Sequence, residues 1–154
     1  MTLGLTNLEI KPLRGNAALL PNQPILQGCY VASSESATLV PGDIVTLASS
    51  GGSGDVIVVK KAGTTDLPFG VVAGCGVKTG FIAKERVSVF PVNSYVYMEA
   101  ADATIARGTV CQFDANGKLK KTNTSSNGEI GVALTAGVSA GDILIVQVKP
   151  GITA

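Results

Sequence analysis

The chain has 154 residues, of which 45% are hydrophobic and 15% charged, and its net charge is +1. That length suits one domain that buries about 70% of the surface of the unfolded chain. The charged fraction lies below the roughly 25% usual in soluble domains, and no basic face of the kind found in nucleic-acid-binding proteins is evident. The composition favours either burial in an assembly or a compact β domain with few surface charges.

Cysteine and histidine usage limits the chemistry. The chain contains Cys29, Cys75 and Cys111 but no His. We expect no metal site, because three Cys would need a further ligand, and we expect the thiols to be small buried hydrophobic groups. The first residues lack the basic and apolar regions of a signal peptide, and no apolar stretch approaches about 18 residues. We therefore expect no membrane span and a protein made in the cytoplasm.

Residues 1–24 are predicted to be an extended arm. Their aliphatic residues are spread among polar ones and interrupted by Pro12, Pro21 and Pro24, which fits neither a helix nor a regular strand. Burying the seven aliphatic side chains would contribute about 10–20 kcal/mol, whereas ordering the backbone would cost roughly 24–48 kcal/mol. We expect the arm to be mobile in a free protomer and ordered in an assembly, as a strand added to a partner's sheet. A leader without a role is the alternative.

Residues 25–154 are predicted to form an all-β, barrel-like domain. About nine or ten short apolar segments alternate with turns that contain Gly, Pro or Asn, a spacing typical of a barrel or sandwich. Alternation over 86–92 predicts a half-buried strand, and Pro91 places that strand at an edge or a bulge. The other predicted strands lie within 25–32, 38–48, 55–61, 69–74, 95–99, 108–113, 130–134 and 141–149.

One short pattern occurs three times. Val40–Leu47 contains a Gly turn that leads directly into an apolar, β-branched strand, and Gly108–Phe113 and Gly141–Val146 repeat it. The segments that follow the first two copies also match, since Phe69–Gly74 resembles Ile130–Gly137. Self-similarity of this kind indicates a repeated strand–hairpin–strand unit.

The sequence contains no recognisable catalytic arrangement. Without His there is neither a Ser-His-Asp nor a Cys-His set, and the Gly-rich segments do not match a phosphate-binding loop. Asp43 and Asp142 occupy equivalent positions in two copies of the repeat, where Thr109 stands in the third. We expect these carboxylates to cap turns, and we expect that the protein is not an enzyme and uses no cofactor.

The order of motifs from Phe69 to Val148 resembles the phage capsid cement, or head-decoration, proteins. Phe69–Gly74 is followed by the strand around Val87–Val92, the hairpin at Asn116–Lys118, the segment Ile130–Leu134 and the turn Ala140–Ile143. The resemblance implies a β-tulip fold of the β-clip kind. It also implies homo-oligomers, commonly trimers, on the outer surface of an icosahedral capsid built from another protein, the major capsid protein.

On this resemblance the protein would clamp neighbouring capsid subunits without binding nucleic acid or membrane. The arm would supply aliphatic anchors, with a basic residue at their rim. The predicted capsid-contacting residues are Leu3, Leu5, Leu8, Ile10, Leu13 and Arg14. The alternative is a β-clip module that binds a glycan or peptide at a virion or cell surface, and an enzyme with an unfamiliar site is the third option.

Overall fold

The computed structural model describes residues 13–18, 23–49, 56–74, 78–121 and 128–149. Within these residues there are ten strands and no helix, hence none that could cross a membrane. The all-β prediction is confirmed.

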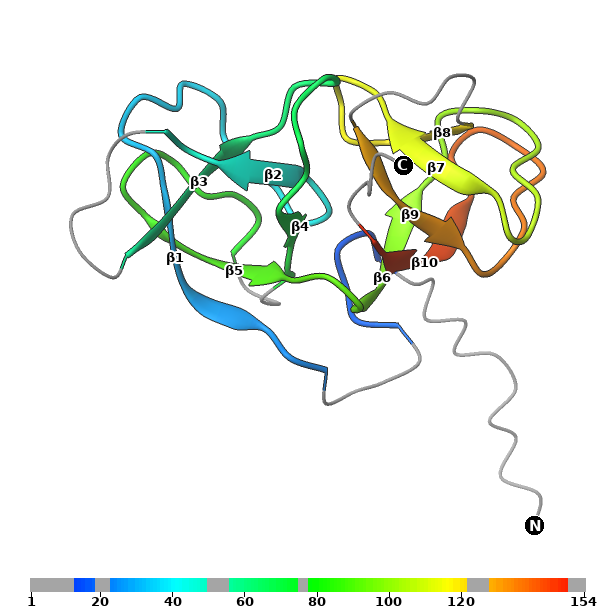
Figure 1. Cartoon of the computed structure of the whole chain (residues 1–154), viewed down its shortest axis with the longest axis horizontal. Coiled ribbons are helices and arrows are strands. Elements are labelled where there is room, and N and C mark those ends of the chain that lie inside the picture. Colours follow the sequence, from blue (N-terminus) through cyan, green and yellow to red (C-terminus); the bar gives the residue numbers. More distant parts are fainter. Residues whose placement is uncertain (1–12, 19–22, 50–55, 75–77, 122–127, 150–154) are drawn as a thin grey trace, which may run out of the picture.

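The strands fall into two units of five that lie side by side (Figure 1). Unit 1 comprises β1 (Leu26–Val31), β2 (Ile44–Leu47), β3 (Ile57–Lys61), β4 (Gly70–Val72) and β5 (Arg86–Phe90). Unit 2 comprises β6 (Tyr95–Glu99), β7 (Val110–Phe113), β8 (Leu119–Lys121), β9 (Glu129–Ala133) and β10 (Ile143–Val148).

The two units have the same strand order. Unit 1 is a closed barrel in the order β3-β2-β4-β5-β1, closed by parallel pairing of β1 with β3, and unit 2 is a sheet in the order β8-β7-β9-β10-β6. A single parallel bridge, between Ala100 and Leu119, joins the two ends of the unit 2 sheet at the corresponding place. Unit 2 is therefore a second copy of the unit 1 barrel with a much shorter closing seam.

The strand registers match at most paired positions, so these positions of unit 1 have counterparts in unit 2. The pairs Ile44–Val71, Leu47–Val59 and Val71–Phe90 of unit 1 correspond to Val110–Val132, Phe113–Leu119 and Val132–Gln147 of unit 2. The repeat seen in the sequence is thus part of a duplication that extends over both units.

The repeated Gly turns share one backbone conformation. Gly42, Gly108 and Gly141 have φ values of 87°, 83° and 93°. In each turn the amide after the glycine donates to a carbonyl three residues earlier, as Asp43 does to Val40 at 2.9 Å. A type II turn needs a positive φ at its third residue, which glycine adopts without steric cost. These turns place the start of β2, β7 and β10.

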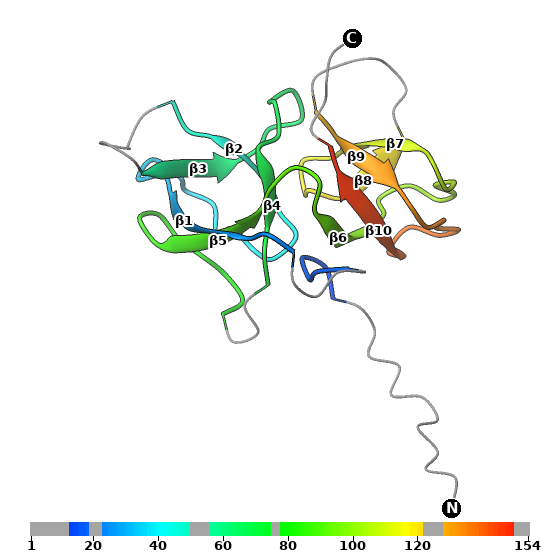
Figure 2. The same cartoon turned by 60° about the horizontal axis from the view of Figure 1, so that its bottom comes forward.

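Two clusters of buried side chains form the core. One lies inside unit 1 and includes Cys29 and Leu39. The other contains the interior of unit 2, and it also includes Ile44, Val71 and Phe90 from the outer wall of unit 1. Figures 1 and 2 show β4 on the side of unit 1 that faces unit 2. The units therefore share a hydrophobic contact.

Two expectations about local structure have different outcomes. Cys29 and Cys111 are free and buried, as predicted, whereas Cys75 lies outside the described residues. Pro91 was predicted to place the strand over 86–92 at an edge or a bulge. The edge alternative is wrong, because β5 pairs with β1 on one side and with β4 on the other. The register between β5 and β1 does shift, on the β1 side between Leu26 and Cys29, and Pro91 directly follows β5.

The predicted division into an arm over 1–24 and one domain over 25–154 stays a prediction. Residues 13–18 and 23–24 of that arm are described, and residues 13–18 lie against β6 of the same chain. The rest of the arm lies outside the described residues.

Replacing Gly131 or its counterpart Gly70 with Ala should destabilise the fold. A Cβ at Gly131 would overlap the carbonyl oxygen of Gln147, and one at Gly70 would overlap that of Phe90. Because strand backbone would have to move, we expect a loss of about 1–3 kcal/mol for each change. Gly28→Ala is the control, since a Cβ there meets no atom within 4 Å. Chemical denaturation measures the three variants, and equal midpoints would contradict this packing.

The Cys111 thiol makes stability depend on alkaline pH. Burial raises the pKa of Cys111 from 9.0 to about 11. The unfolded chain therefore loses this proton first, and the free energy of unfolding falls as pH rises from about 9 to 11. Cys111→Val, which introduces the residue of the counterpart Val45, should show a shallower fall over that range in denaturation curves. Parallel curves for the two proteins would contradict this contribution.

Candidate functional site: the N-terminal junction

Residues 13–18, the N-terminal segment, pair with the free edge of β6. The Gly15 amide donates to the Tyr97 carbonyl at 2.8 Å, the Tyr97 amide donates to the Asn16 carbonyl at 3.0 Å, and the Ala18 amide donates to the Tyr95 carbonyl at 2.8 Å. β10 occupies the other edge of β6. The segment thus acts as an additional strand of unit 2, the β-addition expected for the arm, but here within one chain.

The same segment contacts unit 1. The Gly74 amide, just after β4, donates to the Gly15 carbonyl at 2.9 Å. A Cβ at Gly15 would overlap the backbone of Pro41 and Gly42, so the segment passes directly beside the first repeated turn. The N-terminal segment therefore lies between the units and touches both.

Arg14 is the polar centre of this junction. Its Nη2 lies 2.8 Å from Oδ1 of Asp43 in unit 1, and it also donates to the Asn116 carbonyl in unit 2 at 3.0 Å. The Asp43 side chain is only 1% exposed, and that of Arg14 is 18% exposed. Lys61 Nζ lies 3.7 Å from the second carboxylate oxygen of Asp43. One buried carboxylate is thus compensated by two cations, one of which bridges the units.

Asp43 also caps its own turn. Its Oδ2 accepts from the Val40 amide at 2.9 Å. Asp142 does the same in unit 2, where Oδ2 accepts from Ser139 at 2.9 Å and from Val138 at 2.8 Å, and these bonds lower the pKa of Asp142. The predicted turn-capping role of both carboxylates is confirmed. Only Asp43 adds an ion pair between segments.

Glu85 occupies the equivalent turn position in unit 1. It accepts from the Ile82 amide at 2.8 Å and forms an ion pair with Lys78 at 2.7 Å, which together lower the Glu85 pKa. The turn itself has Lys84, with φ of 69°, where unit 2 has Gly141. Since the pKa values of Glu85 and Asp142 are lowered in the folded protein, their stabilising contributions are lost as pH falls through those values.

The structure tests little of the predicted capsid-contacting set. Leu13 is 65% exposed, and Arg14 makes the contacts described above. The contact role of both stays a prediction. The remaining four, Leu3, Leu5, Leu8 and Ile10, lie outside the described residues.

Sequence reasoning did not identify the Arg14–Asp43 pair or the pairing of Gly15–Ala18 with β6. The partners of Arg14 lie 29 and 102 residues away, so no local pattern links them. A local signal for the pairing of this segment with β6 was nevertheless present. Leu13 to Asn16 forms a turn with Gly15 at φ 79°, the same arrangement as the three repeated turns that precede strands.

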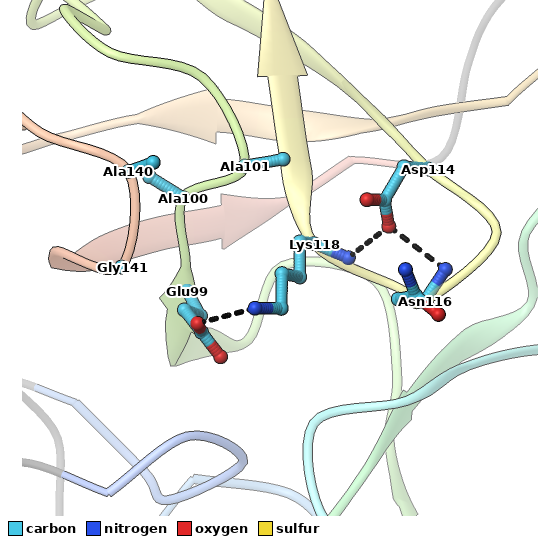
Figure 3. A pocket seen from close by; sticks show the side chains of 8 residues that line it. All are labelled: Glu99, Ala100, Ala101, Asp114, Asn116, Lys118, Ala140 and Gly141. Atoms are coloured by element: carbon cyan, nitrogen blue, oxygen red, sulfur yellow. Dashed lines mark hydrogen bonds and ion pairs between the residues drawn. The ribbon is translucent and has the colours of Figure 1, made fainter.

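A shallow pocket of about 460 Å³ adjoins the junction, because Asn116 contributes to both (Figure 3). In the pocket, Lys118 Nζ lies 2.6 Å from Glu99 Oε1, and Asp114 Oδ1 accepts from the amides of Asn116 and Lys118. Among the lining residues no aromatic ring offers a stacking surface for a sugar. The remaining lining residues are Ala100, Ala101, Ala140 and Gly141.

The chemistry available in the described residues is that of ion pairs and hydrogen bonds. Among them no three His, Cys, Asp or Glu side chains gather as a metal site would require. The expectations of no metal, no cofactor and no catalysis stay predictions.

Comparison with known proteins finds similar solved structures but no matching family model and no matching curated protein. The fold is similar to the crystal structure of the head fiber gp8.5 N base of bacteriophage phi29, with a TM-score of 0.54 and 13% sequence identity. The match covers 79% of this chain and 90% of that one, so nearly the whole of the phage domain shares the fold.

Asp43→Asn should destabilise the protein through the junction. The amide oxygen can still accept from Val40, but Arg14 loses its counter-charge in a buried setting, which costs about 3–5 kcal/mol. Asp142→Asn is the matched control, because Asp142 caps a turn without an ion partner among the described residues. Denaturant titration measures both. Equal effects of the two substitutions would contradict the role of the ion pair.

Proposed function

We propose that the protein is a structural component of a phage virion. It binds the outer surface of an icosahedral capsid and cements neighbouring major capsid subunits. The observation that carries this proposal is the fold shared with the phi29 head fiber base over most of both chains. The ordered motifs that resemble head-decoration proteins support the same class, and the low charged fraction suits a protein whose surface is largely covered in an assembly.

In this proposal the arm is the attachment device. Leu3, Leu5, Leu8 and Ile10 are the anchors, and Leu13, which is 65% exposed, continues the apolar series up to Arg14. Arg14 follows directly and joins both units. A pull on an anchored arm would therefore be transmitted to the whole molecule through the junction.

The proposed partners are the major capsid protein and further copies of the chain. The proposal includes no catalytic step, cofactor, membrane contact or direct contact with nucleic acid. The scattered Lys and Arg and the absence of His in the sequence support this part.

Substituting the arm anchors should weaken capsid binding while preserving the fold. We expect joint replacement of Leu3, Leu5, Leu8 and Ile10 by Asp to reduce affinity at least 100-fold, because each buried aliphatic side chain contributes about 1.5–3 kcal/mol. Co-sedimentation with capsids that lack this protein, from the phage that encodes it, measures the effect.

The control for that experiment is Val138→Asp, which alters an apolar side chain that is 76% exposed and distant in sequence from the arm. Its affinity should equal that of the unmodified protein. Unchanged binding of the arm variant, with an unaltered melting temperature, would refute attachment through the arm.

A further inference from the structure

One end of the unit 2 barrel is covered by the wall of unit 1. Phe113 is 3% exposed and Ile130 is fully buried, and both belong to the cluster that contains Ile44 of the unit 1 wall. The loop after β3 takes part, because a Cβ at Gly128, close to the Phe113 ring, would overlap the Thr64 carbonyl. Contact between the units is thus made by a barrel end on one side and a barrel wall on the other.

Among the residues that the structure describes, the corresponding end of unit 1 is exposed. Leu47, the counterpart of Phe113, is 54% exposed, and the neighbouring Leu67 is 58% exposed. They line a groove of about 160 Å³ together with Thr46, Pro68 and Phe69, none of which is charged. The apolar residues at this end are exposed in unit 1, whereas their counterparts are buried in unit 2. An exposed apolar surface of this kind indicates a binding site for a partner.

The corresponding wall of unit 2 is partly exposed within the described part of the chain. Val110, the counterpart of Ile44, is 40% exposed, whereas Ile44 is only 1% exposed. Val132, the counterpart of the fully buried Val71, is half-buried. Each chain therefore carries an exposed barrel end and an exposed barrel wall, the counterparts of the two surfaces that fit each other inside the chain. At one position the walls differ, because Gln147 stands in unit 2 where Phe90 stands in unit 1.

We propose that the unit 1 end of one copy binds the unit 2 wall of a second copy. The contact between copies would repeat the contact between the units within a chain. Such a contact is heterologous, and it produces a closed ring where the rotation between successive copies closes and an open filament where it does not. The proposal specifies the surfaces of self-association, and its test needs no capsid, so it can fail or succeed independently of the virion role.

The occupant is a second copy rather than an unrelated protein because the chain itself supplies the matching surface. No charged side chain lines the end groove, and the wall of unit 1 meets unit 2 through apolar residues that include Ile44, Val71 and Phe90. Terminal repeats of a stacked array normally carry polar outer faces. Here the two terminal faces keep exposed aliphatic residues instead, which favours continuation of the array by another chain.

Single substitutions should separate the two surfaces. Leu67→Lys disrupts the unit 1 end and preserves the unit 2 wall. Val110→Lys disrupts the unit 2 wall and preserves the unit 1 end. The unmodified protein should form oligomers in size-exclusion chromatography with light scattering, and each variant alone should be monomeric. Ile82→Lys is the control: Ile82 is 58% exposed but precedes β5, at the opposite end of unit 1 from Leu47, and this variant should assemble normally.

Mixing the two variants is the decisive step. In an equal mixture, the Val110→Lys variant supplies an intact end and the Leu67→Lys variant supplies an intact wall. The mixture should therefore give a dimer and nothing larger, because the free end and the free wall of that dimer each contain a lysine. An isologous interface would not be restored in this way. Monomeric unmodified protein at all concentrations, normal assembly of either variant, or a mixture that stays monomeric would each overturn the proposal.

Thermal melting shows whether each variant folds. Should Leu67→Lys melt at a clearly lower temperature, Leu47→Lys tests the same end through a different residue, which is 54% exposed. The same mixing result is then required of the Leu47 variant.

Discussion

The hydrophobic contact between the two units is the constraint on which the rest of the structure depends. Unit 2 has a long gap in its closing seam, and its end is completed by the wall of unit 1. The N-terminal segment covers the free edge of β6, and Arg14 compensates the buried carboxylate of Asp43 together with Lys61. Neither unit would satisfy its apolar and polar groups alone, because each uses atoms of the other.

Duplication explains both the similarity of the units and their differences. The shared positions are those that set backbone geometry, such as Gly70 and Gly131, where a side chain would strike a neighbouring strand. The divergent positions lie on surfaces: Phe113 and Ile44 are covered within the chain, whereas their counterparts Leu47 and Val110 are exposed. In the proposal for self-association, the divergent surface positions are the places where one copy would meet the next.

Much of the fold could be predicted from the sequence because its signals are local. A glycine followed by a β-branched run specifies a turn and a strand, and this held for Gly42, Gly108 and Gly141. The complete duplication was hidden because the turn before β5 uses Lys84 in the left-handed conformation instead of glycine. The role of Arg14 was also hidden, since it depends on partners remote in sequence. Of the two alternatives drawn from Pro91, the edge strand was wrong because the strand ends at Phe90, one residue before the proline.

We propose that this protein works by contact, as a fixed part of a phage particle. Quantitative mass spectrometry of purified virions, from the phage that encodes the chain, tests it most directly. The account predicts that the protein stays with particles through purification, at one constant ratio to the major capsid protein. Its absence from particles, or a ratio that falls with each washing step, would contradict the account.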